Sequence, residues 1–198
     1  MTQDSKAFQA LKEYLQIDNL PPGLIEFKQF KQKSGDLHPL FVDTKLTIPL
    51  GIWLTAEEGE RTKFGKVKSV LGPLSYRPGW HLSDTPYAPH IGIKEDGAIK
   101  YQRNDTVWAL CVVYDHIDWT GIARQRGFNP RTGNFDPKNA CLDCIPTGGY
   151  YWYTTNPNAY GRWLICERMY VVLVLTDEQV EWICWNIFGI HAQPRKAV

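Results

Sequence analysis

The chain has 198 residues, of which 43% are hydrophobic and 22% are charged, as in an ordinary globular domain. The formal net charge of +1 argues against a dedicated duplex-DNA binder, which usually carries a clear basic excess. No apolar run reaches the roughly 18 residues of a membrane-spanning helix, and the polar start over Met1–Leu15 is unlike a signal peptide. We therefore expect a cytoplasmic protein with no membrane partner, whose five cysteines are reduced thiols.

The first predicted element is a short amphipathic helix over Ser5–Gln16. Phe8, Leu11 and Leu15 recur at helical spacing within it. The segment Leu20–Gly23 contains two prolines and a glycine and ends the helix.

A polar, lysine-containing stretch follows up to Asp36, and the sequence changes character at His38. We therefore expect residues 1–37 to be a helix followed by a loosely attached polar arm. Residues 38–192 are expected to form a single α+β domain, and residues 193–198 a frayed tail.

Six segments after the arm are rich in β-forming residues and predict strands. They are Leu40–Val42, Gly51–Ala56, Pro73–His81 with a break at Pro78-Gly79, Thr106–Tyr114, Gly149–Thr155, and Arg162–Leu175 with an interruption at Glu167. Thr106–Tyr114 is apolar on both faces, which is typical of a central strand.

Between the strands, charged, glycine-rich or proline-rich segments predict loops and turns. They are the exposed loop Glu57–Lys68, the loop Ser83–Ile93, the turn Lys94–Gly97, and the long loop Asn129–Ala140. Asp118–Gly127 is expected to hold one or two helical turns.

Thr176 and Gln179 have the spacing of a capping box and predict the start of a final helix. Its buried stripe is formed by Val180, Ile183, Cys184 and Ile187. Strands with few helices and no βαβ alternation predict an α+β fold. We expect a mainly antiparallel sheet, with a split sheet as a variant, and a few flanking helices.

A group of cations precedes His81 in the sequence. If the charged loop folds back on the strand, Lys63, Lys66 and Lys68 would meet Arg77, whose planar guanidinium suits a phosphate or carboxylate. In that interpretation His81 is an acid–base group. The alternative is a solvated loop with one structural arginine and a structural histidine.

Metal-binding signals are weak in this sequence. His81 and His90 flank a proline-containing loop, but no third ligand follows at a recognised spacing. Cys141 and Cys144 form one C-x-x-C without the second pair of a zinc site or the βα context of a redox site. We therefore predict no metal site.

An aromatic segment, Gly148–Tyr153, is followed by Asn156 and Asn158. Strand alternation places Tyr151 and Tyr153 on one side. The functional interpretation is stacking on a base or ring, with amide contacts from the asparagines. The alternative is core packing followed by a turn.

Several stretches resemble a domain that recurs in phage and mobile-element proteins, including large polyvalent ones. The matching segments are His38–Val42, Pro49–Gly59, Lys66–Gly92, Val107–Trp119, Ile145–Asn158 and Trp163–Val180. The blocks Y-R-P-G-W-H and T-N-P-N are the most specific. In the family's looser pattern a glycine stands at Glu167 and a lysine at Tyr170. The resemblance implies a phage or prophage setting in the host cytoplasm, without a settled activity.

A weaker analogy is with ADP-ribosyltransferases, which hold NAD in the cleft of a split, mainly antiparallel sheet. The order of Arg77, an aromatic strand and a late acidic residue is similar. The analogy implies that Arg77 holds phosphate, a tyrosine stacks on a ring, and Glu178 or Glu167 stabilises a developing cation. The Ser-Thr-Ser element and the Glu-x-Glu pair of those enzymes are missing.

Two hypotheses carry comparable weight. The first is a cleft for a nucleotide- or NAD-type phosphate ligand, with catalytic groups at Arg77, His81 and Glu178. Its ligand-binding residues would be Lys66, Lys68, Tyr151, Tyr153, Asn156 and Asn158. The second is a non-enzymatic phage protein that binds a host protein or nucleic acid, and a virion-associated structural role is the third choice.

Overall fold

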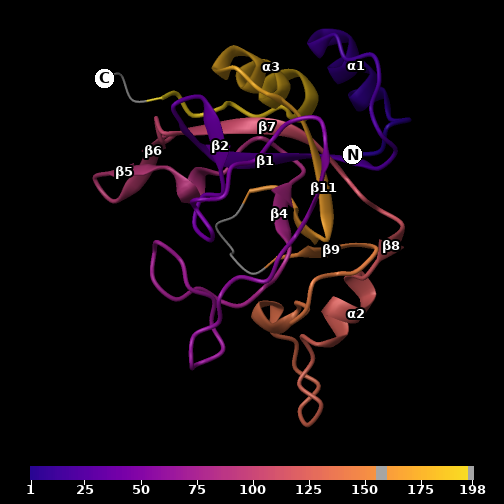
Figure 1. The fold of residues 1–198 in the computed structure, drawn as a ribbon, viewed down its shortest axis with the longest axis vertical. Helices are drawn as coiled ribbons and strands as arrows, with labels where there is room; N and C mark the ends of the chain where they lie inside the picture. Colours follow the sequence, from indigo (N-terminus) through magenta and orange to yellow (C-terminus); the bar gives the residue numbers. More distant parts are fainter. Residues whose placement is uncertain (155–159, 196–198) are drawn as a thin grey trace.

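The computed structural model describes residues 1–154 and 160–195. Within these residues, nine strands form one sheet and two more form a small hairpin, with helices on the outside (Figure 1). All strand pairs are antiparallel except β8 with β9. The predicted α+β class, with a mainly antiparallel sheet, is confirmed.

The strands are β1 (Leu24–Lys33), β2 (Asp36–His38), β3 (Trp53–Thr55), β4 (Trp80–Ser83), β5 (Ile93–Glu95), β6 (Ala98–Tyr101), β7 (Thr106–Val113), β8 (Ile117–Asp118), β9 (Gly149–Tyr153), β10 (Trp163–Cys166) and β11 (Arg168–Val174). The helices are α1 (Lys6–Leu15), α2 (Thr120–Gln125) and α3 (Asp177–Phe188), with short 3-10 turns η1 (Pro89–Ile91) and η2 (Pro137–Asn139). The large sheet has the order β3-β11-β7-β1-β4-β10-β9-β8, and β2 pairs with β1. Within the described residues, no helix combines the length and hydrophobicity needed to cross a bilayer.

The expected loose N-terminal arm is wrong for residues 24–33. These residues form β1, a ten-residue strand in the middle of the sheet that pairs with β7 along most of its length. Ile25, Phe27 and Phe30 are fully buried. The polar residues between them misled the prediction, because both faces of β1 are buried: Ile25 and Phe27 belong to one core and Phe30 to the other, and the polar Glu26 and Gln29 are buried with them.

The expected frayed tail is wrong for residues 193–195. The Arg195 guanidinium is ion-paired with Asp177 and donates hydrogen bonds to the backbone oxygens of Asn104 and Thr106. Because this guanidinium donates to several acceptors at once, it holds this part of the chain against the rest of the protein.

Three of the predicted strands differ in the structure. Arg162–Leu175, expected to be one strand interrupted at Glu167, is divided into β10 and β11, which are not neighbours in the sheet. Leu40–Val42 is a bend that contributes to a groove described below. Within Pro73–His81, only the residues from Trp80 onward belong to the sheet, apart from an isolated bridge between Leu74 and Val67. The break lies at Pro78-Gly79, because proline has no N–H to donate and Gly79 has a φ of +131°.

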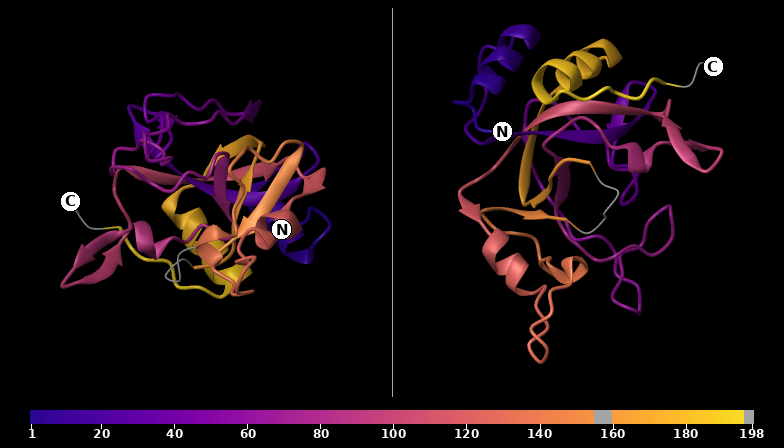
Figure 2. Two further views of the ribbon diagram at one scale, coloured as in Figure 1. Left: turned by 90° about the horizontal axis from the view of Figure 1, so that it is seen from below. Right: turned by 180° about the vertical axis from the view of Figure 1, so that it is seen from behind.

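Helices α1 and α3 cover one face of the sheet, above β1 and β7 in Figure 1, and the view from behind in Figure 2 shows the same layering. Phe8 and Leu11 of α1 and Val180, Ile183 and Cys184 of α3 bury their side chains against this face. The capping box of Thr176 and Gln179 is present as predicted.

The other face of the sheet curls around a second core. Its buried members come mainly from β1, β4, β7, β10 and β11 and include Phe30, Leu82, Cys111, Leu164 and Met169. A third, smaller cluster lies under α2.

The sheet is split between β1 and β4. These two strands share a single register pair, Phe27 with Ser83, whereas β4 pairs along its whole length with β10. Beyond that pair, the Lys28 Nζ crosses the gap and donates a hydrogen bond of 2.8 Å to the carbonyl oxygen of His81. One side-chain bond therefore takes the place of main-chain pairing at the split.

Gly79 fixes how the chain enters β4, and its replacement tests this. A Cβ at Gly79 would lie 2.3 Å from Cγ2 of Ile165 and 3.0 Å from the carbonyl oxygen of Cys166. We expect Gly79→Ala to lower the free energy of unfolding by about 3 kcal/mol or more, from backbone strain plus the clash. The measurement is urea unfolding followed by tryptophan fluorescence.

The matched control is Gly65→Ala. Gly65 also has a positive φ, of +70°, but no atom lies within 4 Å of its added Cβ. It should cost only about 1 kcal/mol. Equal losses in the two variants would show that close packing at Gly79 is unimportant.

Candidate functional site

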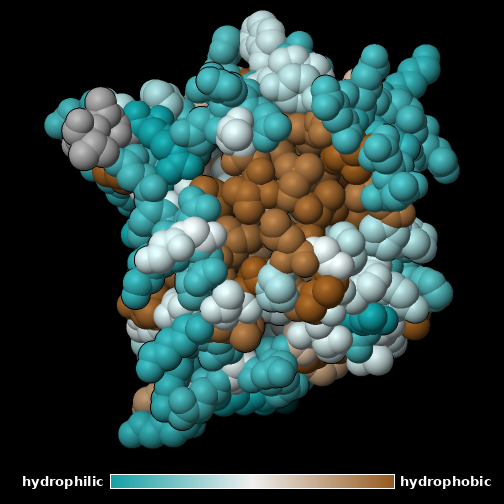
Figure 3. Space-filling view, turned by 45° about the horizontal axis from the view of Figure 1, so that its top comes forward, coloured by the Kyte–Doolittle hydropathy of each residue, from teal (hydrophilic) through white to brown (hydrophobic). Residues whose placement is uncertain are grey.

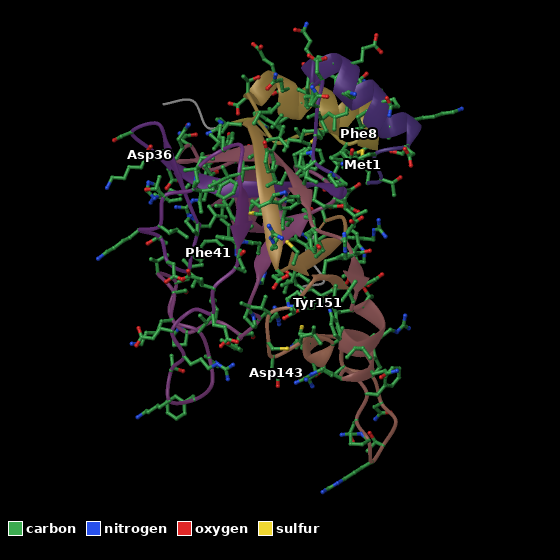
Figure 4. All side chains as sticks on the ribbon, turned by 45° about the vertical axis from the view of Figure 1, so that its right-hand side comes forward. Met1, Phe8, Asp36, Phe41, Asp143 and Tyr151 are labelled. Atoms are coloured by element: carbon green, nitrogen blue, oxygen red, sulfur yellow. The ribbon has the colours of Figure 1, made fainter. Side chains whose placement is uncertain are left out.

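A groove of about 870 Å³ opens where β1 and β4 part. One wall contains Lys28 of β1, Arg77, and Trp80 and His81 of β4, together with Tyr153 of β9. Loop residues 39–43 and 46–48, which include Phe41 (Figure 4), and residues 54–57 contribute further lining. The groove therefore joins segments that lie far apart in the sequence.

His81 lies at the centre of a hydrogen-bond network. Its Nε2 is 2.8 Å from the carbonyl oxygen of Arg77, and its Nδ1 is 3.0 Å from the hydroxyl oxygen of Tyr153. A carbonyl oxygen only accepts, so Nε2 carries the proton and Nδ1 accepts a hydrogen bond from Tyr153. Burial lowers the pKa of His81 to about 4, which keeps the ring neutral near pH 7.

Arg77 is one of the residues that line the groove. Its central carbon lies 5.8 Å from the ring centroid of Tyr153, within the range of a cation–π contact. Among the described residues, no carboxylate lies within 4 Å of this guanidinium. The bond from His81 therefore fixes the backbone of Arg77, while no carboxylate among the described residues compensates the charge of its side chain.

Lys28 is a site residue that the sequence interpretation missed. Its half-buried ammonium lies 5.5 Å from the ring centroids of both Phe30 and Trp80, in addition to its bond to His81. Burial lowers the pKa of Lys28 to about 8. The alternation of apolar and polar residues in the segment L-I-E-F-K could have identified a strand here, but not a lysine facing a groove.

Three predicted ligand-binding residues do not line the groove. Lys66 and Lys68 are exposed, and Lys68 is ion-paired with Glu60, while Val67 between them turns into the groove. Tyr151, a residue of β9, is fully buried in the third cluster, beside the loop that carries Asp143 (Figure 4).

The predicted carboxylates are also outside the groove. Glu178 is exposed in the first turn of α3, which covers the helical face of the sheet. Glu167 accepts a 2.7 Å hydrogen bond from the backbone N–H of Gly148 and so fixes the turn before β9. Asn156 and Asn158 lie outside the described residues, so their predicted contacts stay predictions.

The cysteines and histidines that were considered as metal ligands lie in different parts of the structure. Cys141 is buried and Cys144 exposed, and among residues 1–154 and 160–195 no group of three or more His, Cys, Asp or Glu side chains is arranged to hold a metal ion. His90 also lines the groove, where its ring packs edge-on against Trp163 at 5.4 Å.

The neutral state of His81 predicts a loss of stability on acidification. An unperturbed histidine titrates at 6.5 and folded His81 at about 4, so the unfolded chain gains the proton first as the pH falls. The free energy of unfolding should therefore decline between pH 6.5 and pH 4. We expect urea midpoints of the wild type to fall more steeply over pH 6.5–5 than those of His81→Gln.

The control for this experiment is His191→Gln, which changes an exposed histidine outside the groove. It should keep the wild-type pH dependence. Parallel pH profiles for the wild type and His81→Gln would mean that His81 is not held neutral.

Comparison of the chain with protein-family models, curated proteins and solved structures finds no match in any of the three. The function of the groove is therefore argued from its own geometry and charge.

Proposed function

We propose that the groove binds an anionic ligand with a planar ring, of the nucleotide type, with NAD as one candidate. The observation that carries this proposal is the Arg77 guanidinium, which lies over Tyr153 and has no carboxylate partner among the described residues. Lys28 supplies a second cation in the same groove.

The physical reason is charge compensation. A partly desolvated cation without a counterion raises the free energy of the protein, and an anionic ligand relieves this. Asp43 and Glu57 also line the groove, but neither carboxylate lies within 4 Å of Arg77 or Lys28. A phosphate suits the guanidinium because its oxygens accept two parallel hydrogen bonds.

Aromatic side chains favour a ligand that also contains a ring. The hydroxyl of Tyr153 is occupied by His81, while Trp80 is fixed by its Nε1 hydrogen bond to the carbonyl oxygen of Leu54 at 3.1 Å. Rings that are held in place bind a base or nicotinamide with little loss of side-chain entropy.

The proposal is restricted to binding. Both ring nitrogens of His81 are already engaged, and neither Glu167 nor Glu178 lines the groove. An ADP-ribosyl transfer would need a carboxylate at the reacting sugar, and the two that the sequence suggested are elsewhere. The phage setting stays a prediction from the resemblance.

Arg77→Ala tests the binding site. We expect calorimetry with ADP-ribose, ATP and NAD to show binding of at least one ligand by the wild type. The variant should bind it at least about tenfold more weakly, because hydrogen bonds to a charged group are lost.

The control is Arg131→Ala, which removes an exposed arginine outside the groove. This variant should bind like the wild type. The proposal fails if none of the three ligands binds the wild type, or if Arg77→Ala binds equally well.

Binding of a host protein is the second candidate, because an extended hydrophobic area bordered by hydrophilic residues is exposed on the face in Figure 3. Independently, Leu50 and Ile52, which precede the edge strand β3, are 47% and 52% exposed. Exposed apolar side chains beside a sheet edge are typical of interaction surfaces.

The second candidate predicts that a partner retained from a host lysate is lost when Leu50→Ser and Ile52→Ser are combined. Phe64→Ser, on a separate exposed loop, is the control and should retain it. Quantitative mass spectrometry of the retained proteins measures the difference. Retention that is unaffected by the double change argues against this surface.

A further inference from the structure

Lys28 differs from an ordinary surface lysine in its surroundings. It belongs to β1 in the middle of the sheet, and its side chain lies at the split, where it lines the groove. Lys31, three residues further along the same strand, provides a comparison because its Nζ lies 3.4 Å from the Asp105 carboxylate and its side chain is 44% exposed.

Among the described residues, no carboxylate lies within 4 Å of the Lys28 amine: Asp43 and Glu57 line the same groove without pairing with it, and the buried Glu26 of the same strand is paired with the N-terminal amine. The titratable groups around it are the thiols of Cys111 and Cys166, with His81 and Arg77 on the adjoining wall. Burial raises the pKa of the Cys111 thiol to about 12 and that of Cys166 well above its ordinary value, so both are neutral. His81 is neutral and Arg77 is cationic, and neither favours a proton on Lys28.

The bonding of the amine leaves it able to react. Among the described residues, its Nζ makes one hydrogen bond, to the carbonyl oxygen of His81, and Phe30 and Trp80 provide apolar walls. With its pKa lowered to about 8, about half of the Lys28 amines are unprotonated at pH 8, against less than about 1% of ordinary lysines. An unprotonated amine in an apolar pocket is the form that attacks carbonyl groups.

We propose that Lys28 is a nucleophile that condenses with an aldehyde or ketone ligand carrying an anionic group. The Nζ lone pair forms a bond to the carbonyl carbon. The carbonyl oxygen leaves as water, together with the two hydrogens of the amine, and a C=N bond remains. No oxidant or reductant is needed.

The position of Arg77 sets the class of ligand. Lys28 and Arg77 are both hydrogen-bonded to His81. The Lys28 amine donates to the carbonyl oxygen of His81, and the carbonyl oxygen of Arg77 accepts from the His81 ring. A phosphate or carboxylate on the carbonyl compound would meet Arg77 in the same groove. This part of the inference rests on the proposed anion site, whereas the reaction of the amine does not.

The experiment uses pyridoxal 5′-phosphate as a probe, with borohydride reduction of the imine and peptide mass spectrometry of the full chain. At a limiting amount of probe and pH 8, we expect Lys28 to be labelled at least about tenfold more than Lys31, because it has the larger unprotonated fraction. The labelling rate should rise with pH around a midpoint near 8. Labelling of Lys28 no greater than that of Lys31 would overturn the proposal.

Two variants at Lys28 separate reaction from folding. Lys28→Met and Lys28→Arg should both lose the imine absorbance at this site, and the arginine variant keeps the positive charge at the split. Lys31→Met is the matched control and should retain the absorbance. If a Lys28 variant fails to fold, the labelling map of the wild type decides the question.

A phosphate-free probe distinguishes this proposal from the proposed anion site. Pyridoxal should label Lys28 equally in the wild type and in Arg77→Ala, while labelling by pyridoxal 5′-phosphate should fall at least about fivefold in Arg77→Ala. Lys28 labelling without any effect of Arg77 supports the nucleophile and counts against the anion site. Nucleotide binding without preferential Lys28 labelling supports the anion site and overturns the nucleophile.

Discussion

The hydrogen bond from Lys28 to the carbonyl oxygen of His81 is the interaction on which the groove depends. It joins β1 to β4 where their main-chain pairing has ended at Phe27 and Ser83. The His81 ring continues the connection, since its Nε2 donates to the carbonyl oxygen of Arg77 and its Nδ1 accepts from the Tyr153 hydroxyl. Three strands and the segment before β4 are thereby held in one geometry, and the proposed anion site and the proposed reactive lysine both use residues of this network.

A single histidine can do this only while it stays neutral. A proton on Nδ1 would remove the acceptor for Tyr153 and add a third positive charge beside Lys28 and Arg77. Burial and these two cations all lower the pKa of His81. The hydrogen-bond network and the positive charge of the groove therefore both favour the neutral ring. His81 is therefore better described as a positioning residue than as an acid–base group.

The overall charge of +1 conceals how the charges are distributed. Many surface cations have partners, such as Lys68 with Glu60 and Arg126 with Asp143. In contrast, Lys28 and Arg77 line the groove without a carboxylate within 4 Å among the described residues. Packing of the protein does not by itself require unpaired positive charges in a partly enclosed groove. These charges are the physical basis for both the proposed anion site and the proposed reactive amine.

The sequence by itself determined the features that depend on near neighbours. The capping box of Thr176 and Gln179, the apolar strand β7 and the turn at Asp96-Gly97 were predictable because each follows from local backbone preferences and spacing. Tertiary structure alone decided that Lys28, His81 and Tyr153 meet while Glu178 stays on the helical face. Lys28 and His81 are 53 positions apart in the sequence, and His81 and Tyr153 are 72 positions apart. Sheet order and register, set by burial over the whole domain, bring them together, and no local pattern encodes which distant strands become neighbours.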